Sequence, residues 1–503
     1  MITWGWTGMA HDASLAVFSD GEGLEFAAHS ERYSRIKNDK NMHPLLIREA
    51  LEFGEPERIY FYENPILKKT RQLYAGQYSL LTKESPWNHL MYATGCATSP
   101  FVLPRVRYTS HHHSHAAAGY FTNPWDNSHA AVLVIDSIGE WDTVSIWEGK
   151  DTSLRKKWSQ RYPHSVGIWY SAMTQRIGLK PQEHEYILMG MAAIGDPNKY
   201  YESIKKDFIH KLPSLQDPRI LFKRNCHRGC LNWRPDLTEK DYADIAAAVQ
   251  RIYEEIFELF VKITRKRVDS DNLVLMGGCA LNCVANSIAY KYFKDVWIMP
   301  NPGDAGSAIG CVLAHWKTFM EFPNAYTGHN ISGDYPVEQV LKELLTTGIV
   351  GVAAGRAEFG PRALGNRSLL ADPRKIDNKD KVNEIKHREQ FRPFAPAILV
   401  EEANNYFDGK TGPFMQYTSI CKDSSLPAIV HKDGSSRVQT VQMDPDLGFR
   451  KLLERWYEET GCPVLLNTSL NIKGEPLVNT KEDAFRWTKK YGVKICLPES
   501  GNT

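Results

Sequence analysis

The chain has 503 residues, of which 42% are hydrophobic, and its formal net charge at pH 7 is only +2. This length is sufficient to bury the cores of at least two domains. A charge so close to zero excludes a strong overall attraction to nucleic acid or to a membrane surface, although it leaves room for a local basic patch. No run approaches about 18 apolar residues, so no transmembrane helix is expected.

The cysteines and the first residues indicate the compartment in which the protein is expected to reside. Nine cysteines are scattered along the chain, an odd number without regular spacing. Such a set fits a reducing environment better than a disulfide framework. The opening sequence MITWGWTGMAHDAS lacks the basic start and long apolar run of a signal peptide. We therefore expect a cytoplasmic protein without a membrane partner, and the oligomeric state stays open.

Two strand-and-turn patterns in the first third of the chain are typical of an actin-like ATPase core. Residues 1–20 alternate small and apolar positions around a turn and end in a hairpin signal. A strand over 130–136 ends in Asp136, turns at Gly139 and is followed by a strand over 143–149. Actin-like domains build phosphate loops in this way, so the two hairpins are predicted to be halves of a duplicated core.

A third pattern also predicts a nucleotide. Helical apolar spacing over 241–266 leads into a strand over 273–276, and a glycine pair follows before a further expected helix. This order places backbone N–H groups against a phosphate or ribose. The residues predicted to contact an adenylate in this first domain are Asp12, Asp136, Gly139, Gly277, Gly278 and Asn282.

Histidines cluster in the sequence HHHSH. On a helix, His111 and His115 lie on one face about one turn apart, a spacing that suits two ligands of one divalent ion. Asp304, within the glycine-rich sequence PGDAG, is a candidate third ligand. A polar surface patch is the alternative interpretation, and the roles of His112 and His113 stay open.

His11 lies beside a glycine turn in the sequence GMAHDAS. An imidazole titrates near neutral pH and can accept the proton of an attacking hydroxyl, so His11 is a candidate general base. The alternative is a structural histidine bonded to Asp12 or to the backbone.

The last third of the chain begins after a loop-like stretch over 321–334. A helix over 336–347 and a strand over 349–352 follow. The sequence therefore predicts one domain over 1–330 and a second over 335–503.

Three motifs in the second domain combine cations with Gly, Pro and apolar residues: EFGPRALGNRS, KHREQFRPFAPA and NTSLN. Guanidinium groups flanked by rigid turns suit a small, doubly charged oxyanion, and Asn and Ser can add neutral donors. A surface with ordinary ion pairs is the alternative. The candidate anion-binding residues are Arg362, Lys386, Arg392, Arg437, Asn467, Ser469 and Asn471.

These motifs, with SSRVQT and PVLLNTSLNIKGEP, resemble the nodulation-type O-carbamoyltransferases. The resemblance continues upstream through AHDASLAVFSDGE, SERYSRIKN, HHHSHAAAGYF, YILMGMAAIGDP and GGCALNCVANS, and covers essentially the whole chain. It implies an α/β protein in which a duplicated actin-like, TsaD-like domain precedes a YrdC-like α/β domain.

The resemblance also implies a reaction. ATP, accompanied by Mg²⁺, and carbamoyl phosphate are expected to give carbamoyl adenylate and pyrophosphate in the second domain, where Lys386 and Arg392 would be catalytic. The first domain would then transfer the carbamoyl group to an acceptor hydroxyl. There His11 would be the base, and His111, His115 and Asp304 would hold a divalent metal, for which the resemblance implies Fe²⁺.

The acceptor is open. Residues 204–234 are rich in Lys and Arg. A solvated surface is one interpretation, and capture of a nucleotide or of DNA with a hydroxymethylated pyrimidine is another. A hydroxyl of a small sugar or antibiotic is the alternative acceptor. Modification of tRNA by threonylcarbamoyl transfer and a non-catalytic binding protein are alternatives of other classes. The aromatic residues that would offer stacking platforms are Trp158, Trp169, Phe208, Phe222 and Trp233.

Overall fold

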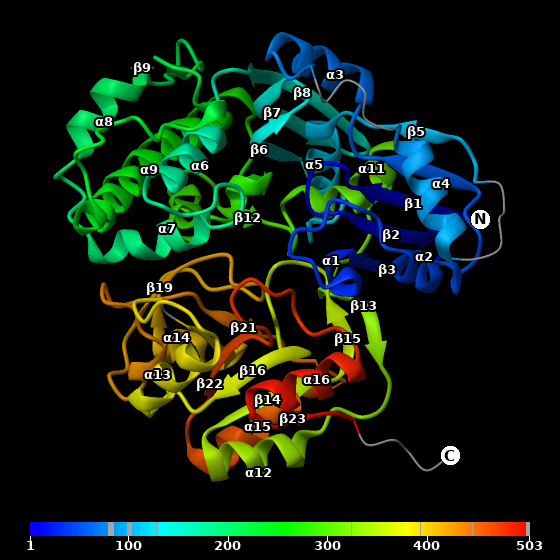
Figure 1. Cartoon of the computed structure of the whole chain (residues 1–503), viewed down its shortest axis with the longest axis vertical. Coiled ribbons are helices and arrows are strands. Elements are labelled where there is room, and N and C mark those ends of the chain that lie inside the picture. Colours follow the sequence, from blue (N-terminus) through cyan, green and yellow to red (C-terminus); the bar gives the residue numbers. More distant parts are fainter. Residues whose placement is uncertain are drawn as a thin grey trace. The chain divides into compact units, whose positions relative to one another are not determined.

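The computed structural model divides into two compact units (Figure 1). The first unit contains Met1–Ser30 and Asp39–Pro323, and the second contains Glu31–Asn38 and Asn324–Thr503. The short segment Glu31–Asn38 thus leaves the first unit and belongs to the second, which the sequence did not predict. Pro323, in the predicted linker, lies outside the described residues. The structure describes residues 1–78, 85–97, 103–125, 129–322, 324–392, 394–444 and 446–498.

The first unit is built on two five-stranded sheets that share one topology. The first has the order β3-β2-β1-β4-β5 and the second the order β8-β7-β6-β11-β12. In each sheet three antiparallel strands are followed by two parallel ones. The two hairpins read from the sequence are therefore the corresponding parts of two repeated α/β sheets. The strands are β1 (Ile2–Thr7), β2 (Ser14–Ser19), β3 (Gly23–His29), β4 (Arg58–Phe61), β5 (Val106–Tyr108), β6 (Ala130–Gly139), β7 (Asp142–Lys150), β8 (Ser153–Arg161), β11 (Asn272–Met276) and β12 (Asp295–Trp297).

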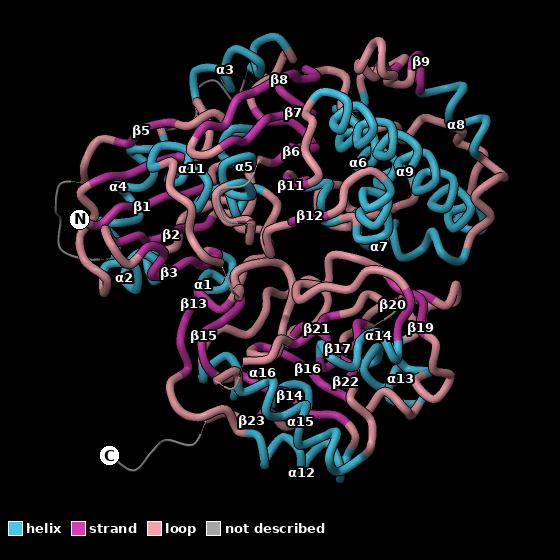
Figure 2. The backbone as a smooth tube through the Cα atoms, turned by 180° about the vertical axis from the view of Figure 1, so that it is seen from behind, coloured by secondary structure: helices cyan, strands magenta, loops and turns pink. Residues whose placement is uncertain are grey.

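Two helices lie between these sheets, α5 (His111–Tyr120) and α11 (Ser307–Trp316) (Figure 2). Helix α11 packs on β1, helix α5 packs on β6 and β11, and the helices pack on each other. Their approach requires a glycine, because a Cβ atom at Gly310 would lie 1.9 Å from the carbonyl oxygen of Ser114. The packing brings the amino-terminal ends of both helices together.

Further helices surround the sheets of the first unit. The helix predicted over 241–266 is present as α9, Tyr242–Arg267. Within the described part of the chain, no helix is both long enough and apolar enough to cross a membrane. The other α-helices of the unit are α2 (Pro44–Leu51), α3 (Pro65–Tyr74), α4 (Pro86–Ala97), α6 (Val166–Arg176), α7 (Glu185–Met191), α8 (Tyr201–Phe208) and α10 (Cys283–Asn286).

The second unit contains a mixed six-stranded sheet with the order β21-β17-β22-β16-β14-β23. Alternate strand residues enter two different hydrophobic clusters, so both faces of the sheet are covered. Helices α12 (Val337–Thr347) and α15 (Gly448–Thr460) cover one face, and α13 (Ile376–Ile385) and α16 (Lys481–Tyr491) the other. The strands are β14 (Ile349–Ala353), β16 (Arg367–Ala371), β17 (Ala395–Leu399), β21 (Gln439–Val441), β22 (Val464–Ser469) and β23 (Ile495–Cys496).

The directions of these strands explain why the scattered motifs meet. Strands β16 and β17 are both antiparallel to β22, and β21 is parallel to β17. The residues that precede β16, β17 and β21 therefore lie at the same edge of the sheet as those that follow β22. These four segments hold the sequences EFGPRALGN, KHREQFR, SSR and SLN.

Candidate active site

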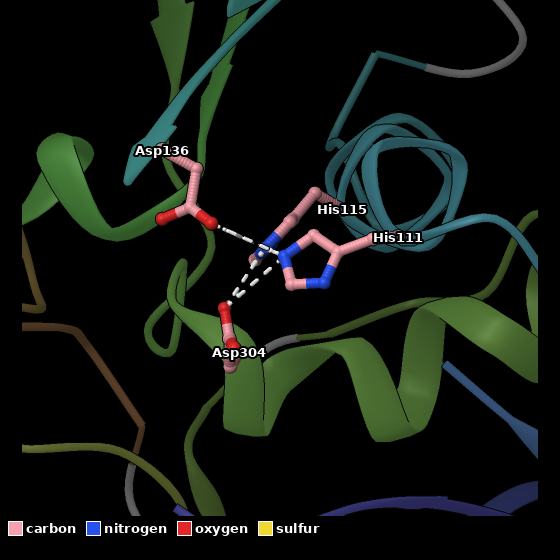
Figure 3. Close-up of side chains that lie close together, drawn as sticks. All are labelled: His111, His115, Asp136 and Asp304. Atoms are coloured by element: carbon pink, nitrogen blue, oxygen red, sulfur yellow. Dashed lines mark hydrogen bonds and ion pairs between the residues drawn. The ribbon is translucent and has the colours of Figure 1, made fainter. Parts of the chain in front are cut away.

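Four buried side chains converge in the first unit (Figure 3). His111 and His115 come from α5, Asp136 from β6, and Asp304 from the turn before α11. Their candidate ligand atoms lie within 4.8 Å of one another. The structure thus brings together the three residues that the sequence predicted as metal ligands, and it adds Asp136.

The distances within this cluster fit a single divalent ion. The Nε2 atom of His111 lies 3.1 Å from that of His115, and both lie 3.3 Å from Oδ1 of Asp304. Ligand atoms around one ion with bonds of roughly 2.1 Å are separated by about 3.0 to 3.4 Å. Two imidazoles with two carboxylates suit first-row divalent metals in general, so the ligand set does not select iron.

Further groups hold the ligands in place. Ser307 Oγ lies 3.2 Å from Nδ1 of His115, and the backbone N–H of Gly278 donates to Oδ1 of Asp136 over 3.1 Å. Glu140 accepts from the backbone N–H of His111. Such contacts orient metal ligands and fix the imidazole tautomer. Glu140 was not predicted, because an isolated glutamate carries no motif.

His11 lies at the edge of the cluster. Its Nε2 atom is 3.5 Å from Oδ2 of Asp304, its Nδ1 atom is 3.1 Å from Oδ2 of Asp12, and its side chain is 41% exposed. Burial lowers the pKa of His11, but the carboxylates of Asp304 and Asp12 outweigh it and raise the pKa to about 9. A divalent cation on the cluster would act in the opposite direction by repelling the proton. The carboxylate of Asp12 therefore has His11 as a hydrogen-bond partner.

The two ambiguous histidines lie outside the cluster. His112 Nδ1 is 2.7 Å from Oγ of Ser145, and burial lowers its pKa to about 3. The ring of His113 stacks on Trp147 with a centroid separation of 5.3 Å. Both histidines therefore serve the packing of α5.

The residues predicted to contact an adenylate have other partners in the structure. A Cβ atom at Gly139 would lie 2.4 Å from the ring of His111, so this glycine makes room for a cluster histidine. Gly277 has φ +91°, and a Cβ there would lie 2.3 Å from the carbonyl oxygen of Ile135. The side-chain amide of Asn282 exchanges two hydrogen bonds with that of Gln250.

These partners change the interpretation of two residues. Asp136 was predicted for the adenylate, but one carboxylate oxygen faces His111 and the other accepts from Gly278. Gly139 borders the same histidine. Both residues therefore belong to the cluster, and adenylate contacts by all six predicted residues stay a prediction.

The edge of the sheet in the second unit is organised around Lys386, which directly follows α13. Its ammonium group is buried and donates to Oγ of Ser469 over 3.2 Å and to the backbone oxygen and Oδ1 of Asn471 over 2.9 and 3.0 Å. It also contacts the backbone oxygen of Ser469. Burial, with the charges of Arg388 and Arg392, holds the pKa of Lys386 well below its ordinary value.

Every one of these Lys386 contacts in the described structure is a neutral oxygen. A buried cation without an opposite charge is costly, and an incoming anion relieves that cost. Lys386, Ser469 and Asn471 thus form a group suited to bind an anion.

Buried polar atoms without a hydrogen-bond partner lie beside this group. Asn467 donates to Oε1 of Gln439 over 2.7 Å and to the backbone oxygen of Ala363 over 3.2 Å. Among the described atoms, its Oδ1 and the Nε of Arg437 have no hydrogen-bond partner. Such orphaned groups are rare in folded proteins and call for a ligand or a water. Gln439 was not predicted, although it follows SSRV directly.

The EFGPRALGNRS motif is folded around a carboxylate. Oε1 of Glu358 accepts from the backbone N–H groups of Leu364, Asn366 and Arg367 over 2.7, 2.9 and 3.2 Å. Three such bonds fix the backbone of the loop that carries the half-buried Arg362. Glu358 is part of the quoted motif, but its role in fixing the loop was not predicted.

Two other arginines of these motifs, Arg367 and Arg388, have described contacts with neutral groups. Arg367 is fully buried and donates only to the backbone carbonyls of five residues in the described hydrogen bonds. The guanidinium of Arg388 lies over the ring of Phe394 at 3.7 Å. By contrast, Arg392 lies 3.5 Å from Oε2 of Glu389.

The basic segment over 204–234 does not have the predicted stacking surface. Trp169, Phe208, Phe222 and Trp233 are all buried. Several of its cations are also paired with carboxylates, in the pairs Lys205–Glu255, Lys211–Asp217, Arg219–Asp217 and Arg234–Asp236. Four of the five aromatic residues expected to stack on a flipped base are therefore buried and cannot offer a stacking surface.

Comparison with known families decides the class. Residues 4–313 match the family described as Carbamoyltransferase N-terminus, and residues 341–500 match Carbamoyltransferase C-terminus. The chain belongs to the carbamoyltransferase family. The resemblance read from its motifs is thereby confirmed.

Several relatives of this carbamoyltransferase span most of its length. The 3'-hydroxymethylcephem-O-carbamoyltransferase of Amycolatopsis lactamdurans is 29% identical and covers 96% of this chain and 95% of its own. The nodulation protein NolNO of Sinorhizobium fredii is 28% identical, over 94% of this chain and 76% of its own. An uncharacterized protein of Synechocystis is 32% identical, over 95% and 92%. Full-length HypF in its phosphate- and nucleotide-bound form covers 62% of this chain and 46% of its own, with 13% identity and a TM-score of 0.37, too weak to support an argument.

We expect inorganic phosphate and pyrophosphate to stabilise the second unit of this carbamoyltransferase. A ligand at 100 times its Kd stabilises a folded protein by about 2.7 kcal/mol. For a domain of this size, that corresponds to a rise of roughly 5 to 10 °C in melting temperature. Differential scanning calorimetry measures the shift, which should largely disappear in Lys386→Met. An equal shift in that variant would contradict anion binding by Lys386.

Proposed function

We propose that the chain is an ATP-dependent O-carbamoyltransferase that works in two half-reactions, one in each unit. The observation that carries this proposal is the buried Lys386 ammonium with neutral partners, at a sheet edge where four motif segments of the chain meet. The second unit is proposed to be YrdC-like and to activate the carbamoyl group. The first unit is proposed to transfer it.

In the first half-reaction, carbamoyl phosphate, ATP and water give carbamoyl adenylate, phosphate and pyrophosphate. Lys386 and Arg392 bind phosphoryl oxygens and stabilise the charge that develops on them, with Mg²⁺ accompanying the ATP. Ser469 and Asn471 hold the ammonium in place. Arg362 and Arg437 add guanidinium donors, and Asn467 binds the carbamoyl or nucleotide oxygens through its amide.

In the second half-reaction, an acceptor hydroxyl attacks the carbamoyl carbon, a new C–O bond forms and AMP leaves. His11 takes the hydroxyl proton, since it lies beside the cluster and remains partly exposed. His111, His115, Asp136 and Asp304 would hold a divalent metal, for which Fe²⁺ is one candidate. That ion would supply Lewis-acid polarisation of the reacting oxygens and lower the pKa of His11.

The acceptor is proposed to be a hydroxyl of a small molecule, such as an antibiotic or a sugar. The name of the Amycolatopsis relative, 3'-hydroxymethylcephem-O-carbamoyltransferase, supports this class. A nucleotide or DNA acceptor loses its main support because the aromatic residues of the basic segment are buried. The small-molecule hydroxyl therefore replaces the nucleotide as the first candidate.

Mass spectrometry of candidate acceptors tests this proposal. Antibiotic, sugar, hydroxymethyl nucleotide and hydroxymethylated DNA are incubated with enzyme, ATP, Mg²⁺ and carbamoyl phosphate, and the mass of one added carbamoyl group is sought. We expect transfer to a small neutral hydroxyl that does not depend on salt. Charge reversal of Lys223 and Arg224 should leave it unchanged. Transfer only to DNA, weakening steeply with salt, would overturn the acceptor class.

A further inference from the structure

The segment Glu31–Asn38 is an excursion of the chain from the first unit into the second. It contains the short helix α1 (Glu31–Ser34). The segment is closed on itself, because the carboxylate of Glu31 accepts from Nζ of Lys37 over 3.2 Å and from the backbone N–H of Asn38 over 2.8 Å. Arg35 and Asn38 have positive φ angles, so the backbone turns at both residues. Hydrogen bonds within the segment and these turns together give it a fixed conformation.

Two arginines of the excursion hold backbone carbonyls of the second unit. Nη2 of Arg32 donates to the carbonyl oxygen of Gly360 over 2.9 Å, and the side chain is only 3% exposed. Arg35 donates from Nη1 to Leu477 over 2.5 Å and from Nη2 to Pro476 over 3.0 Å. Each arginine also lies near a carboxylate: Nε of Arg32 is 3.8 Å from Oε1 of Glu31, and Nη1 of Arg35 is 3.7 Å from Oδ2 of Asp483.

The carbonyls that they hold belong to the two loops of the proposed anion site. Gly360 lies two residues before Arg362, in the loop that Glu358 fixes from inside. Pro476 and Leu477 follow the turn in which the side-chain amide of Asn471 donates to the backbone oxygen of Glu475 over 2.6 Å. Each arginine therefore fixes one loop that carries a predicted anion-binding residue.

Both ends of the excursion are attached to the loop of His11. The backbone N–H of Ser30 donates to the carbonyl oxygen of Ala13, and the N–H of Ala13 donates to that of Asp39, each over 2.7 Å. The N–H of Met9 donates to the carbonyl oxygen of Lys40, also over 2.7 Å. The chain on either side of His11 is thus bonded to the residues at which the excursion begins and ends.

We propose that Glu31–Asn38 is a positioning segment that fixes the two anion-binding loops through Arg32 and Arg35 and, through its ends, the loop of His11. Neither arginine is assigned a contact with a reactant. This one continuous segment, with the residues that flank it, would thereby set the backbone geometry used in both half-reactions. The catalytic consequence of this inference rests on the proposed function, whereas its structural content does not.

Hydrogen–deuterium exchange tests the positioning directly. The variants are Arg32→Gln, Arg35→Gln and the double variant, and Arg455→Gln is the matched control, since Arg455 forms only surface ion pairs in its described contacts. We expect about tenfold faster exchange in peptides over 359–367 and 472–479, the effect of losing one buried hydrogen bond to a charged group. The double variant should also show faster exchange over 8–14.

The pattern of exchange distinguishes positioning from general stability. Unchanged exchange in either second-unit loop would overturn the proposal, as would an equal rise throughout β14 and β16 in the core of the sheet. Unchanged exchange over 8–14 in the double variant would overturn the connection to His11. These outcomes hold whether or not the protein makes carbamoyl adenylate.

Steady-state kinetics gives the second readout. We expect Arg32→Gln to raise KM for carbamoyl phosphate about tenfold in the pyrophosphate-releasing reaction, and Arg32→Lys to recover part of the loss because it keeps a charged donor. Wild-type kinetics in Arg32→Gln would contradict a positioning role. If the wild-type protein itself releases no pyrophosphate, the proposed function fails, and the exchange experiment still decides the role of the segment.

Discussion

Replacing Lys386 by methionine is expected to lower pyrophosphate release from ATP, measured with carbamoyl phosphate and without an acceptor, by about two to three orders of magnitude. The ammonium group is buried, its described partners are neutral oxygens, and its pKa is held well below the ordinary value by burial and by two neighbouring arginines. An anionic substrate supplies the missing opposite charge. Methionine keeps the length and apolar body of the side chain and removes the charge together with its hydrogen bonds to Ser469 and Asn471. A coupled pyrophosphate assay measures the rate.

Lys379→Met is the matched control for this experiment. Lys379 lies on α13, is partly buried and donates to the backbone oxygen of Val430 over 3.4 Å, so its removal also deletes a lysine with a neutral partner. We expect its rate to stay near that of the wild type, and Arg392→Ala to resemble Lys386→Met. Equal pyrophosphate release in Lys386→Met and Lys379→Met would remove Lys386 from the reaction.

Replacement of His111 or His115 by alanine should abolish metal binding and carbamoyl transfer and leave pyrophosphate release largely intact. Each variant removes one of four buried ligands from a cluster whose atoms lie within 4.8 Å of one another. Loss of a ligand from such a site costs most of the metal affinity, whereas the proposed activation step uses residues of the other unit. Elemental analysis of the purified protein and product mass spectrometry measure the two effects.

His113→Ala is the control, because His113 lies on the same helix and stacks on Trp147 outside the cluster. It should keep both metal and transfer. If His111→Ala or His115→Ala retained a full complement of metal, the cluster would be an ordinary buried polar network.

Local patterns in the sequence predicted those features that depend only on neighbouring residues. The helix over 241–266 has an apolar face along its whole length, and it is present as α9. His111 and His115 face the same side of α5 because they are separated by one helical turn. The match of motifs to one family fixed the enzyme class, because several long segments agreed in order.

Other features depend on contacts between distant residues and leave no local pattern. The contact of Asp136 with His111 was not predicted, because it arises from the packing of α5 against β6. The aromatic residues near the basic segment were candidates for stacking on a base, but tertiary packing buries Trp233 and Phe208. Arg32 has no neighbour in sequence that predicts a bond to Gly360, 328 residues away.

Exchange of labelled pyrophosphate into ATP, in the presence of carbamoyl phosphate and the absence of any acceptor, tests the division into two half-reactions most directly. The wild-type protein and His111→Ala are predicted to catalyse this exchange at similar rates, and Lys386→Met is predicted to lose it. No exchange by the wild-type protein, or equal loss in His111→Ala and Lys386→Met, would contradict an activation step confined to the second unit.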